Sequence, residues 1–220
     1  MQRLVVHTAD GSSSVYVPDL NESYHSRHGS VQESQHVFIQ AGLAETAKLK
    51  KEITVLEIGF GTGLNTLLAY LFARENQLAV HYHAIEAFPL ENDILIRLNF
   101  SDILPDDENT FQKLHKAEWN KPIRVAPLFM LEKYAITLQD FQWEGKADVV
   151  FFDAFAPRVQ PELWTPEIFL KIYGMMNAGG ILVTYCAKGE VKRNLKKAGF
   201  SVEALPGPAG KREMTRAIKS

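Results

Sequence analysis

A glycine-rich turn between a buried strand and a helix constrains this chain more than any other feature. Residues 54–58 are mostly apolar, and the run stops at Gly59. From Leu64 onwards the apolar residues recur at helical spacing. In open α/β sheets, the order of strand, glycine turn and helix presents a backbone edge to a nucleotide-like ligand. The chain is therefore expected to adopt an α/β fold.

The spacing of the glycines narrows the class of ligand. A dinucleotide fingerprint, G-x-G-x-x-G, needs a third glycine at position 64, which Leu64 occupies, and the loop lacks the Lys-Ser/Thr pair of a P-loop. The pattern E-x-G-x-G-x-G instead resembles motif I of class I S-adenosylmethionine (SAM) methyltransferases. A tight turn that uses glycine only for its backbone geometry is the alternative. The resemblance implies that SAM contacts come from Glu57, Gly59, Phe60, Gly61, Thr62, Gly63 and Asn65.

Two acidic residues follow later strands of the expected sheet. Glu86 ends an apolar run over 80–85 and lies 23 residues past Gly63, where nucleoside-binding folds place the carboxylate that accepts the ribose hydroxyls. Asp153 follows the run 147–152, whose continuous apolar character indicates a strand buried on both faces. Ligands bind outside the carboxyl ends of such strands. Both carboxylates are therefore expected to face the crevice beside the glycine loop.

The rest of the chain is expected to complete one domain over residues 1–220. Residues 1–45 form an N-terminal extension with a β-hairpin and a helical second half. The Rossmann-like core over 46–220 contains a seven-stranded, mostly parallel sheet with an antiparallel edge hairpin. The strands of the hairpin are expected over 4–8 and 14–17. Helices are expected to begin at Val31 and at Leu64 and to lie over 89–99 (opened by Pro89), 110–119, 161–176 and 189–198. Further strands are expected within 123–134 and over 181–186 (after a turn at 178–180), 200–205 and 212–218.

Composition excludes several other classes of protein. The 46% hydrophobic and 23% charged content is typical of a soluble globular domain. There is neither an apolar run of 18 residues nor a charged-then-apolar leader, so no membrane span or signal peptide is expected. The single cysteine, Cys186, fits a reducing cytoplasm. His81 and His83 have no companion ligands at metal spacing, so they are expected to be packed or hydrogen-bonded, and no metal site is expected.

Three further segments make the resemblance more specific. Residues 151–169, 182–200 and 207–217, with their D-x-F-x-P, P-E-L-W and K-R-E-M blocks, resemble the methyltransferase domain of the MnmC family. That family makes the last methylation in building 5-methylaminomethyl-2-thiouridine at the tRNA wobble position. The resemblance implies SAM as cofactor and tRNA as partner. Because family members are commonly fused to a flavin-dependent oxidase domain, it also implies a separate oxidase. One departure is Thr137, which stands where relatives carry an acid near the adenine, so a weaker contact is expected there.

The chemistry of methyl transfer to an amine points to Asp153. A free alkylamine has a pKa of about 10 and must be neutral to react. A carboxylate at the crevice can accept hydrogen bonds from the amine, orient its lone pair and take the proton. Asp153 is the candidate, and it would also contact the cofactor; the alternative is a turn-capping aspartate. Tyr185 and Lys188, near the end of the next strand, are weaker candidates.

Basic residues are concentrated near the C-terminus. Residues 188–220 hold nine Lys/Arg and three acids, so the remaining 187 residues carry a net charge of −8 in a chain of net charge −2. This asymmetry favours an anionic partner, with a solvated helix face as the equal alternative. The expected tRNA contacts are Lys188, Lys211 and Arg212, of which Lys211 and Arg212 are ranked above the helix cations Lys192, Arg193, Lys196 and Lys197. The polar segment 24–28 is expected to be either a substrate-side cap or a surface loop.

The resemblance thus implies a cytoplasmic enzyme that methylates the aminomethyl group of 5-aminomethyl-(2-thio)uridine in tRNA. Two other enzyme classes share the fold: an N-methyltransferase of another amine, and an aminopropyltransferase of the spermidine-synthase type. The latter normally has a longer glycine run with an embedded aspartate, which GFGTGLN lacks. A SAM-binding module without catalysis is a third alternative. Asp153 beside an intact glycine loop argues against it.

Overall fold

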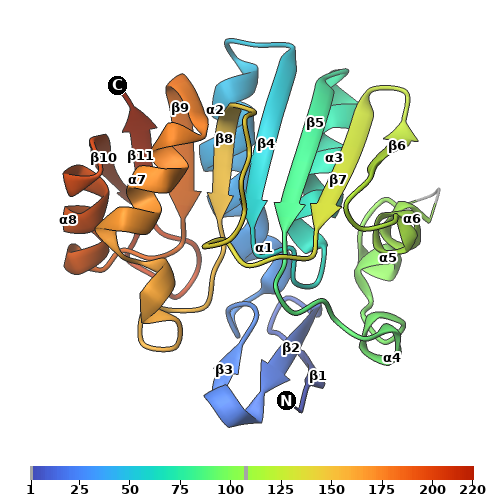
Figure 1. The fold of residues 1–220 in the computed structure, drawn as a ribbon. Coiled ribbons are helices and arrows are strands. Elements are labelled where there is room, and N and C mark those ends of the chain that lie inside the picture. Colours follow the sequence, from blue (N-terminus) through green and yellow to red (C-terminus); the bar gives the residue numbers. More distant parts are fainter. Residues whose placement is uncertain (1, 107–108) are drawn as a thin grey trace.

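The computed structural model describes residues 2–106 and 109–220, and an eight-stranded sheet forms its centre (Figure 1). The strand order is β10-β11-β9-β8-β4-β5-β7-β6. The bounds are β4 Glu52–Ile58, β5 Ala79–Ile85, β6 Pro122–Ala126, β7 Phe129–Tyr134, β8 Ala147–Phe152, β9 Met176–Thr184, β10 Phe200–Pro206 and β11 Glu213–Lys219.

The middle of this sheet is parallel and its edges are antiparallel. Neighbouring strands from β9 to β7 run parallel, whereas β6 and the β10–β11 hairpin pair antiparallel at the two edges. The predicted mostly parallel sheet with an antiparallel edge hairpin is confirmed. The predicted number of seven strands was wrong by one, because the segment 122–134 folds into two strands and adds a second antiparallel edge.

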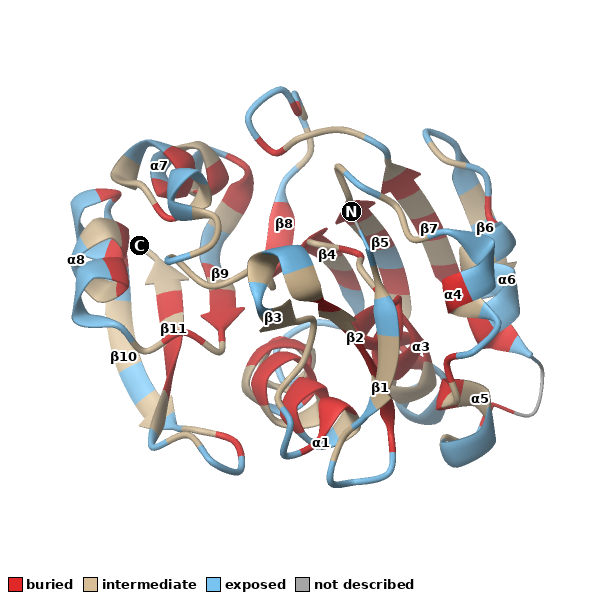
Figure 2. Ribbon diagram, turned by 90° about the horizontal axis from the view of Figure 1, so that it is seen from below, coloured by how far each residue is buried: buried red, intermediate tan, exposed pale blue. Residues whose placement is uncertain are grey.

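Side chains alternate between the two faces of the sheet along the central strands, and both faces are buried. Val55 and Phe151 pack with α3 (Leu64–Asn76) in one apolar cluster, and their neighbours Leu56 and Val150 pack in a second one with α7 (Pro166–Gly174) and α8 (Gly189–Lys197). Successive side chains of a strand point to opposite faces, so a strand covered on both sides must be apolar throughout. Figure 2 shows the resulting buried residues along β4, β5 and β8.

The N-terminal extension begins with a small antiparallel sheet of β1 (Leu4–His7), β2 (Ser13–Val17) and β3 (Glu22–Ser23). The predicted hairpin is confirmed by the β1–β2 pairing, while β3 and the short 3-10 turn before it, η1 (Pro18–Leu20), were not predicted. In Figure 1 this small sheet lies beyond the arrowheads of the central parallel strands. It therefore covers the edge of the main sheet at which α/β folds bind ligands.

A continuous helical segment follows this small sheet and confirms the helix expected from Val31. It consists of α1 (Ser30–Ser34), a π-helix, η2 (Gln35–Leu43), and α2 (Ala44–Ala47). A π-helix of nine residues has no sequence signature of its own and was not predicted. Gly42 lets η2 approach the sheet, because a Cβ there would lie 2.9 Å from Val183 Cγ2.

The helix predicted over 89–99 is wrong in extent. Only α4 (Asn92–Leu95) is helical there, Glu91 is its extended N-cap, and a separate helix, α5 (Phe100–Ile103), follows. Pro89 does not open the helix. The guanidinium of Arg3 donates to the carbonyl oxygens of Phe88 and Pro89 at 2.8 and 3.1 Å, which helps to hold this stretch outside a helix. The helix expected over 110–119 is confirmed as α6 (Thr110–Lys116), three residues shorter.

Two further boundaries differ from the prediction. The helix expected over 161–176 is divided into a 3-10 turn, η3 (Pro161–Leu163), and α7. Thr165 separates them because a residue before proline avoids the helical region, and its side chain caps α7 by accepting from the N–H of Ile168. Strand β9 begins at Met176, so residues 178–180 lie inside it instead of forming a turn before it. The helix expected over 189–198 and the strands over 200–205 and 212–218 are confirmed as α8, β10 and β11, within one residue at each boundary.

Candidate active site

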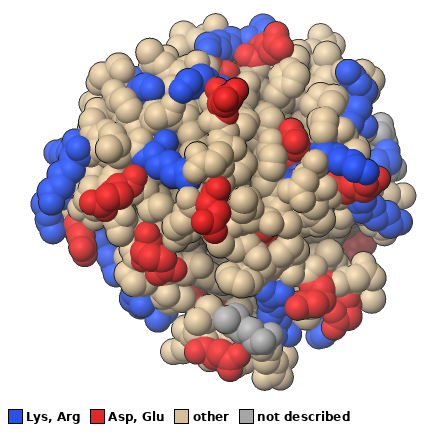
Figure 3. Space-filling model, in the orientation of Figure 1, with Lys and Arg blue, Asp and Glu red and all other residues tan. Residues whose placement is uncertain are grey.

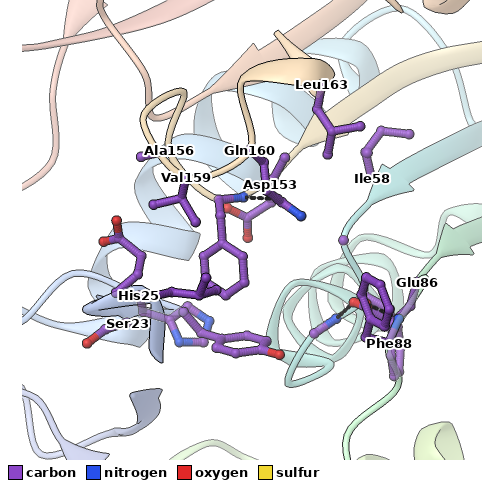
Figure 4. Close-up of a pocket in the computed structure, with 18 of the residues that line it drawn as sticks. Ser23, His25, Ile58, Glu86, Phe88, Asp153, Ala156, Val159, Gln160 and Leu163 are labelled. Carbon is purple, nitrogen blue, oxygen red and sulfur yellow. Dashed lines mark hydrogen bonds between the residues drawn. The ribbon is translucent and has the colours of Figure 1, made fainter. Parts of the chain in front are cut away.

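A cavity of about 850 Å³ lies between the carboxyl ends of the central strands and the N-terminal extension. This volume is in the range of small-molecule sites, about 300–1,000 Å³. In Figure 4, Glu86 and Asp153 stand on opposite sides of the cavity, and Ser23 and His25 approach from the N-terminal extension. Sequence reasoning thus located the cavity and two of its carboxylates. It left open whether the N-terminal segment takes part.

The glycine loop adopts the conformation that its sequence predicts. Gly59, Gly61 and Gly63 have φ of +93°, +49° and +74°, a region that disfavours other residues. At Gly59 a Cβ would lie 2.7 Å from the backbone oxygen of Asp153, so only glycine lets the ends of β4 and β8 meet. The N–H groups of residues 59 and 60 both donate to the carbonyl oxygen of Ile85 at 3.0 Å. The loop is therefore hydrogen-bonded to the end of β5 and lies against the end of β8.

Glu86 leaves the end of β5 and holds this loop from the side. One carboxylate oxygen accepts from the N–H of Gly61 at 2.9 Å, and the other accepts from the N–H of Phe88 at 2.9 Å. A carboxylate oxygen has two acceptor positions, so each oxygen of Glu86 can take a further hydrogen bond. A ribose diol has two such donors, and the binding of the ribose by Glu86 stays a prediction.

Asp153 leaves the end of β8 and lies next to the glycine loop on the cavity wall. Its carboxylate accepts a hydrogen bond from Asn65 Nδ2 at 2.9 Å, and Asn65 lies in the first turn of α3. Burial raises the pKa of Asp153 to about 7, although the Asn65 hydrogen bond acts in the opposite direction. Asp153 is therefore a carboxylate that can exchange a proton near neutral pH.

The comparisons with known proteins agree with this geometry. A profile of the family described as "S-adenosyl-L-methionine-dependent methyltransferase" matches residues 111–220, half of the chain. The chain belongs to this methyltransferase family. SAM is therefore its cofactor, as predicted, and the class I SAM methyltransferase fold is confirmed.

Relatives and solved structures extend the match over nearly the whole chain. The tRNA 5-methylaminomethyl-2-thiouridine biosynthesis bifunctional protein MnmC of Cupriavidus metallidurans is 30% identical over 91% of this chain, and that of Campylobacter hominis is 32% identical over 84%. The matches span 32% and 28% of those relatives, so this methyltransferase aligns with about a third of their length. The crystal structure of MNMC2 from Aquifex aeolicus has a TM-score of 0.83 and 27% identity, covering 100% of this chain and 71% of that one. The predicted resemblance to MnmC is confirmed.

The cavity of this methyltransferase suits a sulfonium nucleoside. Glu86 can accept from ribose hydroxyls, and the carboxylate of Asp153 supplies negative charge near the loop. The side-chain NH₂ group of Asn65 donates a hydrogen bond to Asp153. The side-chain carbonyl oxygen of Asn65 is buried and has no hydrogen-bond partner in the described part of the chain. Such buried acceptors normally find a donor, and an amino group can supply one.

Glu57 and Gly63 do not line the cavity, whereas Phe60, Gly61, Thr62 and Asn65 do. Glu57 is fully buried, accepts from Thr66 Oγ1 at 2.9 Å, and has a pKa raised to about 8 by burial. We infer that it supports the turn from below. Direct SAM contacts of Glu57 and Gly63 stay predictions.

Thr137 lies on the cavity wall, as expected, but its hydroxyl is already engaged. It donates to Asp140 Oδ2 at 2.7 Å and accepts from the N–H of Asp140 at 3.2 Å. The structure thus brings an acid, Asp140, into the turn that Thr137 begins. The contact of Thr137 with adenine stays a prediction.

The segment 24–28 is a cap on the cavity, which settles the alternative that its polar sequence left open. Tyr24 and His25 line the cavity, and the Tyr24 ring meets Phe155 edge-to-face with 5.0 Å between ring centroids. Arg3 also joins the N-terminal extension to the segment that follows Glu86, because its guanidinium forms an ion pair with Glu91 at 2.8 Å. The contact of Arg3 with this region was not predicted from the sequence.

The predicted tRNA contacts fall into two groups. Lys211 lines the cavity and pairs with Glu33, whereas Lys188 and Arg212 are exposed outside the lining. On α8, Lys192 pairs with Glu213 at 2.8 Å. Figure 3 shows Lys and Arg side chains gathered at the edge of the molecule that α8 occupies, with acidic side chains beside them. The basic end is thus a surface with partly compensated charge.

The contacts of two histidines and the character of the helices bear on metal binding and on membrane insertion. His83 is hydrogen-bonded to the Tyr134 hydroxyl at 3.0 Å, and His81 contacts Glu52 at 3.3 Å, as expected for packed or hydrogen-bonded histidines. Within residues 2–106 and 109–220, no three His, Cys, Asp or Glu side chains form a group that could hold a metal ion. In the same residues, no helix is both long and apolar enough to cross a membrane.

Proposed function

We propose that this methyltransferase methylates the aminomethyl group of 5-aminomethyl-(2-thio)uridine at the wobble position of tRNA. The observation that carries the proposal is the position of Asp153, a carboxylate able to exchange a proton near pH 7, between the SAM loop and a capped cavity. The name of the relatives, which concerns 5-methylaminomethyl-2-thiouridine in tRNA, supports this choice of acceptor.

The arrangement suits the chemistry of this reaction. SAM supplies a methyl group on a sulfonium. The amine nitrogen forms a bond to the methyl carbon while the carbon–sulfur bond breaks, and sulfur keeps the electron pair. The amine loses one proton, which Asp153 accepts. Holding the nitrogen in line with the methyl group is the main contribution of the cavity walls, because orientation removes most of the entropic barrier.

The aromatic pair at the cavity suits a nucleobase. A wobble base lies in a single-stranded loop and can be extruded at small cost, and proteins that bind such bases stack them on aromatic side chains. Tyr24 and Phe155 come from opposite walls and meet edge-to-face. We assign them to the base, with the aminomethyl group directed to Asp153.

An oxidase activity is the expected source of the aminomethyl substrate. The relatives are called bifunctional, and this chain aligns with about a third of their length. We propose that an oxidase activity outside these 220 residues delivers the aminomethyl tRNA, since a methyltransferase consumes that amine and cannot generate it.

The function is tested with tRNA that carries the aminomethyl group at the wobble uridine. Incubation with SAM and this methyltransferase should convert the nucleoside to its methylaminomethyl form, detected by mass spectrometry of the digested tRNA. The same tRNA without the aminomethyl group is the control and should stay unmodified. If the tRNA is not methylated while small alkylamines are, the acceptor is another amine and the proposal is wrong.

Binding of tRNA should depend steeply on salt through the exposed basic residues. Each lost phosphate contact flattens the slope of log K against log salt by about 0.7–0.9. Lys188→Ala/Arg212→Ala should therefore flatten it by roughly 1.4–1.8. The Lys196→Ala/Lys197→Ala variant should change it less. Fluorescence titration over a salt series measures the slope.

A matched control for that titration lies at the opposite end of the sheet. Lys48 and Lys51 are exposed and flank the start of β4, far along the strand from the cavity. The Lys48→Ala/Lys51→Ala variant should bind tRNA like the wild type. If the Lys188/Arg212 variant also matches the wild type in affinity and slope, those two residues make no phosphate contact.

A further inference from the structure

Four basic side chains line the cavity, and three of them are already paired with carboxylates. Each of these three ion pairs has a separation of 2.8 Å or less: Arg3–Glu91, Arg158–Glu22 and Lys211–Glu33. The fourth, Arg27, is exposed, and within residues 2–106 and 109–220 no ion pair or hydrogen bond engages its guanidinium. Among the described residues of the lining, Arg27 therefore carries the positive charge that is free for a ligand.

The backbone around Arg27 is held in place, so its side chain starts from a fixed point. The carbonyl oxygen of Arg27 accepts from the N–H of Ala9 at 2.9 Å. The N–H of Ser26 donates to Glu33 Oε2 at 2.7 Å, and the Ser26 hydroxyl oxygen accepts from the N–H of His28 at 3.2 Å. A cation on such a preformed turn meets a ligand with little further loss of backbone entropy.

Arg27 also lies close in the chain to the aromatic residue that we assign to the base. It follows Tyr24 by three residues, and three residues span at most about 10 Å. When a base enters the cavity, the phosphates on either side of its sugar stay with the RNA backbone at the rim. An exposed cation of the lining, near the base, is placed to meet one of them.

The charge of the lining as a whole does not attract a phosphate. Its acidic and basic side chains are Glu22, Glu33, Glu86, Asp153 and Glu162 against Arg3, Arg27, Arg158 and Lys211. A phosphodiester that approaches this rim is therefore repelled by carboxylates unless an unpaired cation faces it. Arginine suits that position, because its planar guanidinium can donate two parallel hydrogen bonds to a phosphate.

We propose that Arg27 binds a phosphate next to the wobble nucleotide and so positions the base for methyl transfer. The proposal rests on the proposed function, because it assigns Arg27 to the tRNA substrate of that reaction. Contacts to phosphate fix the register and orientation of a nucleic acid without reading its sequence. With its base against Tyr24 and a phosphate on Arg27, the nucleotide is held at two points. Arg27 takes no part in the proton transfer to Asp153.

The test combines a change in the protein with the loss of one charge in the RNA. Anticodon stem-loop hairpins with an aminomethyl wobble uridine are made with a neutral methylphosphonate on the 5′ side or on the 3′ side of that nucleotide. Fluorescence titration at one salt concentration gives their affinities, and single turnovers with saturating SAM give the rates. Neutralising the phosphate that Arg27 binds should weaken binding to the wild type about 10-fold or more, as expected for a charge-assisted hydrogen bond.

The variants show whether the arginine and that phosphate act as a pair. Arg27→Ala should weaken binding of the all-phosphate hairpin by a similar factor, and the methylphosphonate should then cause no further loss. Arg27→Lys keeps the charge but loses the paired donors, so it should lie between. The matched control is Arg124→Ala, an exposed arginine outside the lining, on β6 beside the start of β7. This control should show the full wild-type loss.

The outcomes separate this inference from the proposed function. If the losses from Arg27→Ala and from the methylphosphonate multiply at both phosphates, Arg27 contacts neither of them and the inference is overturned. A merely structural role would give this result, because it would weaken all hairpins alike. A wild type that does not bind the all-phosphate hairpin overturns the inference as well. If the wild type binds as expected but transfers no methyl group to the aminomethyl uridine, the proposed function fails while the phosphate contact stands.

Discussion

Replacing Asp153 by asparagine is expected to slow methyl transfer by about 10²–10⁴-fold, the usual contribution of a positioned proton acceptor. The amide has nearly the same shape and can still accept from Asn65, so the fold and most of the SAM affinity should persist. It cannot take the proton of the amine. Single-turnover rates with aminomethyl tRNA and saturating SAM measure the effect.

A matched aspartate provides the control for this experiment. Asp102 is exposed on α5 and makes no part of the cavity lining, so Asp102→Asn should react at the wild-type rate. Near-normal rates in Asp153→Asn, with tRNA binding intact, would show that Asp153 is not the proton acceptor.

Glu86→Ala should weaken SAM binding by about 1.5–3 kcal/mol, roughly a 10- to 150-fold rise in the dissociation constant. Two causes act together. The variant loses the acceptors for the ribose hydroxyls, and it frees the N–H of Gly61 that Glu86 now holds. Isothermal titration calorimetry on the folded variant gives the affinity.

The amide variant at this position separates those two causes. Glu86→Gln keeps one oxygen that can hold the Gly61 N–H, while it loses half of the acceptor capacity towards the ribose. Its affinity should lie between those of the wild type and Glu86→Ala. An unchanged affinity in Glu86→Ala would place the ribose elsewhere in the cavity.

The cofactor half of the site was predictable because its signals are local. An apolar run followed by glycines defines both a strand and the turn at its end, and an acid directly after such a run must lie at the edge where ligands bind. Gly59, Glu86 and Asp153 all satisfy this rule, and the structure places each at the predicted strand end.

The part of the cavity assigned to the methyl-accepting substrate could not be predicted in the same way, since it depends on contacts between distant segments. Tyr24 becomes a cavity residue only because the N-terminal sheet lies across the strand ends. The prediction of a helix over 89–99 was wrong for a similar reason, because Arg3 donates hydrogen bonds to the stretch before α4. Local propensity contains no information about either partner.

Lys211 illustrates how a charge count differs from a charge distribution. The C-terminal surplus of positive charge is a property of the sequence, and it suggested a contact to an anionic ligand. In the structure the charge of Lys211 is balanced by Glu33, which belongs to the other end of the chain. Which cations remain available to a partner depends on pairing that a sequence window cannot include.

The Glu33–Lys211 pair also affects the order in which the site can assemble. It joins residues 178 positions apart, whereas the bond between Gly61 and Glu86 spans only 25. Closing the longer loop costs roughly 2 kcal/mol more chain entropy, so the contacts of the cofactor loop can form first. We expect hydrogen exchange at Ser26 and in the β10–β11 loop to be faster than at the end of β4. The cavity wall that contains Ser26 and the β10–β11 loop would then open as a unit of its own. Nucleic acid could enter while the cofactor loop keeps its hydrogen bonds.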